Sequence, residues 1–335
     1  MFEPRRRPRL AIALLGLIAS AFLAGAPVDA GSQVPPSAIS VSDTLLEIRL
    51  TDGSVLFGRI VTIDGDRVTI ATESGGRIEV ARSSLTSARP TRARLVGGER
   101  WDADPNGTRL FFGPTARAVG AGSGYFAVYE LFLPYITVGI TDFFSFSGGT
   151  PIVPEAMGEV FYLAPKVTVL NAERTQLAAG VLAFFGTEED GAAGLLYGVG
   201  TFGSRDNAVS VGAAFPFVTS SGDGLADQPA IMIGAEARSS RRTKFITENY
   251  FVPGESGAII SGGYRFFGER LSADAGLGIF IDDGDAVCCI PLVNFVYTWG
   301  PPAARGRAVR AAPAAGSLAA RSLATAPGGG TRTRR

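Results

Sequence analysis

The sequence predicts an all-β protein, in which an antiparallel transmembrane β-barrel of about twelve strands follows a small β-module. Three observations lead to this fold class. The chain opens with a secretory leader, short apolar or alternating segments recur between Thr108 and Trp299, and no stretch after the leader is long enough for a transmembrane helix. Backbone groups in lipid must be paired internally, so strands cross a membrane only as a closed barrel.

Residues 1–30 are expected to be a signal peptide. A cluster of arginines precedes the apolar run 10–26, and residues 28–30 form a small-residue cleavage site. The alternative is a retained membrane anchor, but the run is shorter than the roughly 20 apolar residues that a spanning helix needs. Cleavage is therefore favoured, and residues 31–43 then form a Ser/Pro-rich leader of the mature chain.

Residues 44–88 are expected to fold as a small β-module. Alternating apolar and charged residues begin at Leu46, and turn sequences at 51–54, 64–66 and 73–76 separate four short strands. The pattern resembles that of Sm-like or SH3-like small barrels, although the RNA-gripping residues of Sm proteins are not recognisable. A contact with a periplasmic protein, or a spacer role, is the expected use of this module. A polar linker, residues 89–107, follows it.

Residues 108–299 are expected to form the barrel. The rhythm gives about 16 residues per strand and turn, against the 9–11 that a tilted membrane strand requires. Prolines inside some segments predict bulges or strand ends there, because proline removes a ladder donor. The expected segments are 108–118, 125–139, 143–152, 159–170, 175–186, 192–203, 207–217, 229–238, 243–251, 257–267, 270–280 and 289–299.

The alternation separates a lipid face from a lumen face. In 231–238, 271–280 and 292–299, large apolar residues share one face, while glycine, polar and charged residues share much of the other. A charge on the lipid face costs roughly 2–4 kcal/mol at the midplane, so charged residues belong in the lumen. The lumen-facing candidates are Arg109, Arg117, Glu130, Lys166, Glu236, Arg238, Glu248, Arg265 and Asp274. They either line a pore and set its selectivity or pair with one another in a filled lumen, and their mixed sign slightly favours the second.

The absence of histidine excludes Ser-His-Asp and Cys-His mechanisms and His-based metal sites. We therefore expect no enzyme, although an envelope enzyme with a carboxylate mechanism stays open as an alternative, and we expect no cofactor and no metal. The acidic clusters at 188–190 and 282–285 are expected to be solvated loops rather than Ca²⁺ sites. The glycines of 198–203 are expected to be strand glycines. Adjacent strand residues point to opposite faces, so Cys288 and Cys289 are expected to be free thiols.

Charge is distributed unevenly along the chain. The formal net charge is zero, but the expected signal peptide, residues 1–30, and the tail, residues 300–335, hold an excess of arginine. The remaining body of the chain is therefore acidic. An acidic body argues against a nucleic-acid partner. The Ala/Arg-rich tail has no periodicity and is expected to be disordered.

Several short sequence segments resemble those of a group of uncharacterised bacterial outer-membrane β-barrel proteins. They are 109–115, 124–126, 163–166, 197–203, 247–250 and 263–266. The resemblance covers about residues 108–299 and implies the fold and an outer-membrane location, with outer-membrane lipid and the barrel-assembly machinery as partners. It implies no activity.

Two functional interpretations follow. The first is an outer-membrane barrel that acts as a narrow pore or a structural envelope component, with a periplasmic module. The alternative is a soluble, secreted β-barrel that binds a small apolar ligand, whose outward faces should be polar. The apolar faces of 271–279 and 293–299 argue against this alternative.

Overall fold

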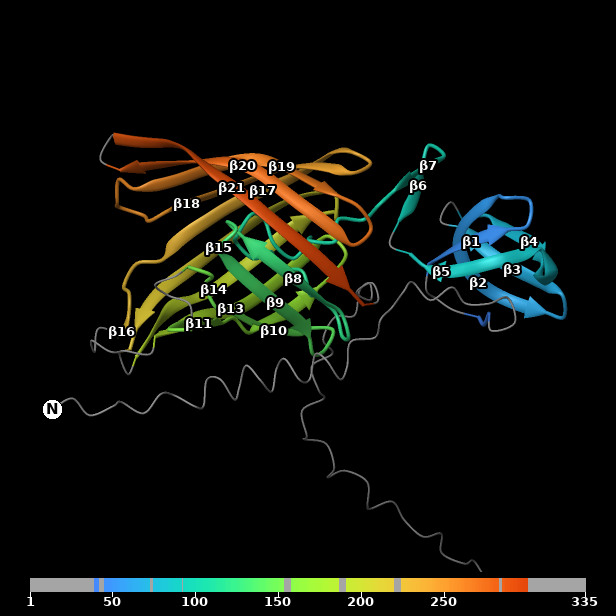
Figure 1. The fold of residues 1–335 in the computed structure, drawn as a ribbon, viewed down its shortest axis with the longest axis horizontal. Helices are drawn as coiled ribbons and strands as arrows, with labels where there is room; N and C mark the ends of the chain where they lie inside the picture. The colour runs from blue at the N-terminus through green and yellow to red at the C-terminus, as the bar shows by residue number, and fades with distance from the viewer. Residues whose placement is uncertain are drawn as a thin grey trace, which may run out of the picture.

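The computed structural model describes residues 39–41, 45–72, 75–91, 93–153, 158–186, 191–219, 224–282 and 285–300. The expected signal peptide lies outside the described residues, as does the expected disordered tail except for Gly300. The described part consists of a small five-stranded sheet, a two-stranded hairpin and a large closed barrel (Figure 1). Its helical content is one short 3-10 turn, Arg82–Ser84. No helix among these residues has the length and apolar character to cross a membrane.

The barrel is a closed antiparallel ring of 12 strand positions, which confirms the predicted fold class. Strands β11 and β12 share one position, broken at Ala164 and Pro165, and the short β16, Gly224–Leu225, pairs only with β15. The ring closes where β21 pairs with β8, with Trp299 opposite Gly124. The wall strands are β8 (Gly124–Tyr129), β9 (Leu133–Gly139), β10 (Phe144–Gly149), β11 (Val160–Leu163), β12 (Lys166–Asn171), β13 (Thr175–Gly186), β14 (Ala192–Gly203), β15 (Asn207–Val218), β17 (Ala230–Ser240), β18 (Thr243–Phe251), β19 (Ala258–Phe267), β20 (Leu271–Asp282) and β21 (Asp285–Trp299).

Two of the expected segments are wrong as strands. The segment 125–139 is two strands, because Glu130 and Leu131 adopt positive φ (50° and 64°) and turn the chain between β8 and β9. The segment 108–118 is not part of the wall and holds only an isolated bridge between Arg109 and Pro114. One expected segment is lost and one is split, so the strand count is unchanged.

The two faces of the wall strands differ as the alternation predicts. On β20 and β21, Leu271 is 63% exposed and Phe295 is 51% exposed, whereas Asp274 and Asn294 are 2% and 1% exposed. Successive side chains of a strand point to opposite sides of a sheet, so one set lies outside the barrel and the other inside. The wall therefore presents an apolar belt outward and polar groups inward.

The two ends of the barrel differ in their connections. At one end the chain turns tightly, at 140–143, 172–174, 204–206, 241–242 and 268–270, whereas the other end carries the longer connections 150–159 and 219–229. We call these the short-turn end and the long-loop end. Strand β8 begins and strand β21 ends at the short-turn end, where the small module and the hairpin also lie (Figure 1).

The small module is a five-stranded antiparallel sheet in the order β4-β3-β2-β1-β5. Its core is formed by apolar side chains that include Ile48, Ile60, Val68 and Ile70. The fifth strand extends beyond the four that the turn sequences predict, and the expected linker contains a hairpin. The strands are β1 (Leu46–Leu50), β2 (Val55–Asp64), β3 (Arg67–Thr72), β4 (Arg77–Ala81) and β5 (Leu85–Pro90), with β6 (Arg94–Val96) and β7 (Glu99–Trp101) forming the hairpin.

The adjacent cysteines are joined in a disulfide, so the expectation of free thiols is wrong. Cys289 has a positive φ of 69°, which takes it out of the extended conformation in which neighbouring side chains point apart. The pair lies where the register between β20 and β21 shifts, opposite Ile279.

We predict that Gly124→Val destabilises the closed ring. A Cβ at this position would lie 2.4 Å from both the Thr137 carbonyl oxygen and the Trp299 ring. Forcing in the extra atoms should cost about 1–3 kcal/mol. The measurement is the heat-modifiable gel shift of the folded barrel as a function of temperature. Gly198→Val is the control, because a Cβ there meets nothing within 4 Å; equal melting of the two variants would contradict the prediction.

Candidate functional site

The candidate site is the lumen, which the chain itself occupies. Residues 102–119, which we call the plug segment, run inside the ring ahead of the first wall strand. Leu110 and Phe111 are each 1% exposed, and Ala116 is fully buried. These three side chains form one apolar cluster with wall residues that include Val199 and Ile246.

Arg265 on β19 holds the middle of the plug segment. Its guanidinium donates to the carbonyl oxygens of Asn106, Arg109 and Leu110 at 2.8, 3.1 and 2.6 Å. It also donates to both carboxylate oxygens of Asp274 on β20, at 2.6 and 2.9 Å. The side chain is fully buried, so wall and plug together satisfy a charge that has no access to water.

Other wall side chains bind the plug backbone farther along. Glu248 on β18 accepts the backbone N–H groups of Phe112 and Gly113, both at 3.0 Å. Lys166 on β12 donates to the carbonyl oxygens of Thr115 and Arg117, at 3.1 and 2.8 Å. These contacts use charged groups to satisfy peptide groups that would otherwise be buried without partners.

Three uncharged side chains of the wall also contact the plug backbone. Asn294 on β21 donates from its amide to the Phe111 carbonyl oxygen at 2.9 Å. Ala116 donates its N–H to the Thr201 hydroxyl at 2.9 Å, and the Thr168 hydroxyl donates to the Ala116 carbonyl oxygen at 3.1 Å. The plug segment therefore pairs with side chains of the wall rather than with a strand edge.

Charges of alternating sign continue across the lumen. Lys244 Nζ lies 2.9 Å from the Asp104 carboxylate and 2.8 Å from that of Glu236, and Glu236 also pairs with Arg117 of the plug segment. Burial alone would raise the pKa of the Asp104 carboxyl, but the charges of Lys244 and Arg265 outweigh burial and hold that pKa below its usual range. The carboxylate therefore stays ionised at neutral pH.

Glycines of the wall make room for the apolar side chains of the plug segment. A Cβ on Gly234 would lie 2.2 Å from the Leu110 side chain, and a Cβ on Gly276 would lie 2.9 Å from the Phe111 ring. Both glycines lie on the lumen face of their strands, next to Glu236 and Asp274 in the alternation. The wall and the plug segment are thus complementary in shape as well as in charge.

The predicted lumen residues fall into three groups. Six are on wall strands, and their side chains make the contacts described here, whereas two belong to the plug segment rather than to the wall. Glu130 lies at the turn between β8 and β9, where its carboxylate accepts the Val293 N–H at 3.3 Å. The wall group is Lys166, Glu236, Arg238, Glu248, Arg265 and Asp274, and the plug group is Arg109 and Arg117.

Sequence reasoning missed Asp104 and Lys244. The alternation of 292–299 placed Asn294 on the lumen face, where the structure has it, although Asn294 was not among the charged candidates. The alternation of 243–251 puts Lys244 on the same face as Ile246 and Glu248, so Lys244 could have been found. Asp104 lies in the expected linker and gave no such signal. Within the described ranges, no three His, Cys, Asp or Glu side chains gather as a metal site.

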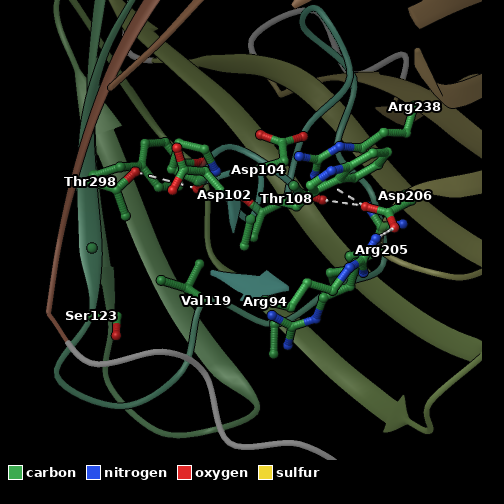
Figure 2. A pocket seen from close by; sticks show the side chains of 18 residues that line it. Arg94, Asp102, Asp104, Thr108, Val119, Ser123, Arg205, Asp206, Arg238 and Thr298 are labelled. Atoms are coloured by element: carbon green, nitrogen blue, oxygen red, sulfur yellow. Dashed lines mark hydrogen bonds and ion pairs between the residues drawn. The ribbon is translucent and has the colours of Figure 1, made fainter. Parts of the chain in front are cut away.

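A cavity lies between the plug segment and the short-turn end (Figure 2). Asp206 in the turn 204–206 pairs with Arg94 of the hairpin and, at 3.2 Å, with Arg238 of β17. The Arg238 guanidinium also lies 5.0 Å from the centre of the Trp101 ring. The β6–β7 hairpin is therefore attached to the barrel mouth by charge and by cation–π contact.

The small module contacts the same end through a buried glutamate. Glu47 on β1 is 2% exposed and pairs with Arg89 at 2.8 Å and with Arg100 of the hairpin. Both arginines also reach Glu269 in the turn 268–270, at 3.3 and 3.2 Å. One network of charges thus links the module, the hairpin and the barrel.

No family model matches the chain, and no curated protein matches it. Among solved structures it is similar to the KdgM porin, with a TM-score of 0.37 and 7% identity over 53% of this chain and 97% of that one. It is also similar to OmpT of Vibrio cholerae (TM-score 0.29, 12% identity, 76% and 94% covered) and to OccK11 (OpdR) of Pseudomonas aeruginosa (TM-score 0.30, 11% identity, 76% and 93% covered). These TM-scores are low, so the fold class is assigned from the strand pairing and not from these similarities.

We predict that Asp104→Asn loosens the plug segment. Lys244 and Arg265 would keep Glu236 and Asp274 as partners, so the expected loss is the charge assistance in the two contacts that Asp104 makes with these cations, about 2 kcal/mol in total. The measurement is protease cleavage within 102–119 in the folded barrel, which should become faster. Asp64→Asn, on the exposed surface of the module, is the control. Cleavage at the same rate in all three proteins would contradict the prediction.

Proposed function

We propose that this protein is a bacterial outer-membrane barrel whose lumen is held closed by its own plug segment. The observation that carries the proposal is the pairing of the plug backbone with Arg265, Glu248 and Lys166. A solute that passes through the lumen must break these buried contacts, each of which involves a charged group. We therefore favour a closed structural component of the envelope, or a barrel that opens only when the plug segment moves, over a permanently open narrow pore.

The outer surface supports a membrane location. Large apolar side chains cover the outside of the wall, among them Leu271, Leu277 and Phe295, which are 63%, 54% and 51% exposed. Leaving such a belt in water is unfavourable, and monomeric soluble proteins rarely expose contiguous apolar surface of this kind. The alternative of a soluble, secreted barrel is for this reason not favoured.

The two ends support an orientation. Outer-membrane barrels carry short turns on the periplasmic side and longer loops outside. We infer that the short-turn end, with the β6–β7 hairpin and the module 44–88, faces the periplasm. The module is then positioned to contact a periplasmic protein or to act as a spacer, and the barrel, within 108–299, to contact outer-membrane lipid and the assembly machinery.

The membrane location is tested by fractionation of cells that express the full chain. We expect the protein in the outer-membrane fraction, with a gel migration that changes on heating because a closed barrel resists detergent at low temperature. Recovery as a soluble periplasmic protein without detergent would contradict the proposal and support the alternative of a soluble, secreted barrel.

The closed lumen is tested by conductance in planar bilayers. We expect the unaltered protein to be silent and Gly276→Leu to conduct, because a side chain at position 276 takes the space of the Phe111 ring and displaces the plug segment. A second variant, in which residues 105–117 are replaced by a Gly/Ser linker, tests the same point without altering the wall. Gly198→Leu is the control, since a Cβ at position 198 meets nothing within 4 Å. Steady conductance of the unaltered protein at the level of the linker variant would show an open pore.

A further inference from the structure

A second cavity lies on the other side of the plug segment, toward the long-loop end. Its volume is about 110 Å³, and its floor is formed by Arg109, Phe112 and Pro114 of the plug segment. The walls come from the parts of neighbouring strands that lie toward the long-loop end. They are apolar or aromatic and include Leu182, Leu195, Tyr197, Ala214, Met232 and Tyr250. The chemistry of this cavity differs from that of the charged cavity at the short-turn end.

Arg109 is the one cation in the lining of this apolar cavity. It has no ion pair within the part of the chain that the structure describes. Its guanidinium donates to the hydroxyl oxygens of Tyr125 and Tyr135, at 2.9 and 2.6 Å, and to the Phe112 carbonyl oxygen at 2.8 Å. A guanidinium carries five N–H groups, so two of them remain for another partner.

Aromatic rings hold the guanidinium in place. Its central carbon lies 4.4 Å from the centre of the Tyr135 ring and 5.6 Å from that of Tyr129. Tyrosine hydroxyls and rings orient a cation but supply no formal negative charge. The site is therefore rigid and retains an unbalanced positive charge, in surroundings where such a charge is costly.

The carboxylates nearby are engaged elsewhere. Glu248 accepts two plug N–H groups and the Tyr250 hydroxyl, at 2.6 Å, and Glu130 accepts the Val293 N–H. Neither is among the residues that line this cavity. Neither carboxylate therefore balances the charge of Arg109.

We propose that this cavity binds a small anionic amphiphile, whose carboxylate pairs with Arg109 and whose apolar body lies against Leu182, Leu195 and Met232. The apolar walls disfavour a sugar, which needs polar partners along its length, and the single cation disfavours a polyanion. The small volume suits one short hydrocarbon chain or one ring. This inference goes beyond the closed barrel, because it concerns a ligand of the cavity that the wall forms with the plug segment in its observed place.

The test is binding of octanoate to the purified full-length barrel in non-ionic detergent, measured by equilibrium dialysis, with octanol as the uncharged analogue. We expect saturable binding of octanoate at one site and binding of octanol weaker by about tenfold or more, because the charged group supplies hydrogen bonds that the alcohol lacks. Arg109→Gln should weaken octanoate binding by a similar factor. Arg67→Gln, a change on the exposed surface of the module, should leave it unchanged.

A second variant separates loss of binding from loss of structure. Ala214→Phe fills the cavity and leaves Arg109 and its tyrosines intact, so octanoate binding should fall while the heat-modifiable gel shift persists. Val211→Phe, on the lipid face of the same strand, is the matched control. Equal octanoate binding by the unaltered protein, Arg109→Gln and Ala214→Phe would overturn the proposal, as would equal binding of octanoate and octanol. Conductance measurements are independent of these outcomes, so failure here leaves the closed-barrel proposal standing.

Discussion

The buried guanidinium of Arg265 is the contact on which the interior depends. It pairs with Asp274 on the next strand, with Asp104 of the plug segment and with three plug carbonyl oxygens. A fully buried charge is tolerated only when its partners are complete, because removing one leaves an unpaired charge in a medium of low polarity. With the plug segment displaced, Arg265 would keep Asp274 as its partner but lose the Asp104 carboxylate and three carbonyl oxygens.

The size of the ring explains why a chain segment is needed inside it. Side chains fill the interior of an eight-stranded barrel, whereas barrels of 16 to 18 strands enclose an aqueous channel. A ring of 12 strands is intermediate, and here its lumen-facing glycines leave still more space. Leu110 and Phe111 use that space at Gly234 and Gly276. Shape complementarity and charge pairing thus both hold the plug segment in the lumen.

The plug segment divides the lumen into two chemically different halves. The short-turn half is ionic: Asp206 pairs with Arg238 and with Arg94 of the hairpin, and Glu269 pairs with Arg89 of β5. The long-loop half is apolar and aromatic, with Arg109 at its floor. The same short segment contributes residues to both halves.

The sequence by itself determined the β-class, the position of most wall strands and the two faces of each, because a strand's period of two is a local property of the backbone. It also placed Glu236, Glu248, Arg265 and Asp274 on one side. Only the tertiary structure decided that 108–118 lies inside the ring, since an apolar run looks the same in a wall strand and in a buried plug. The split of 125–139 likewise depends on a turn without glycine. The role of Asp104 depends on partners that lie more than a hundred residues away in the chain.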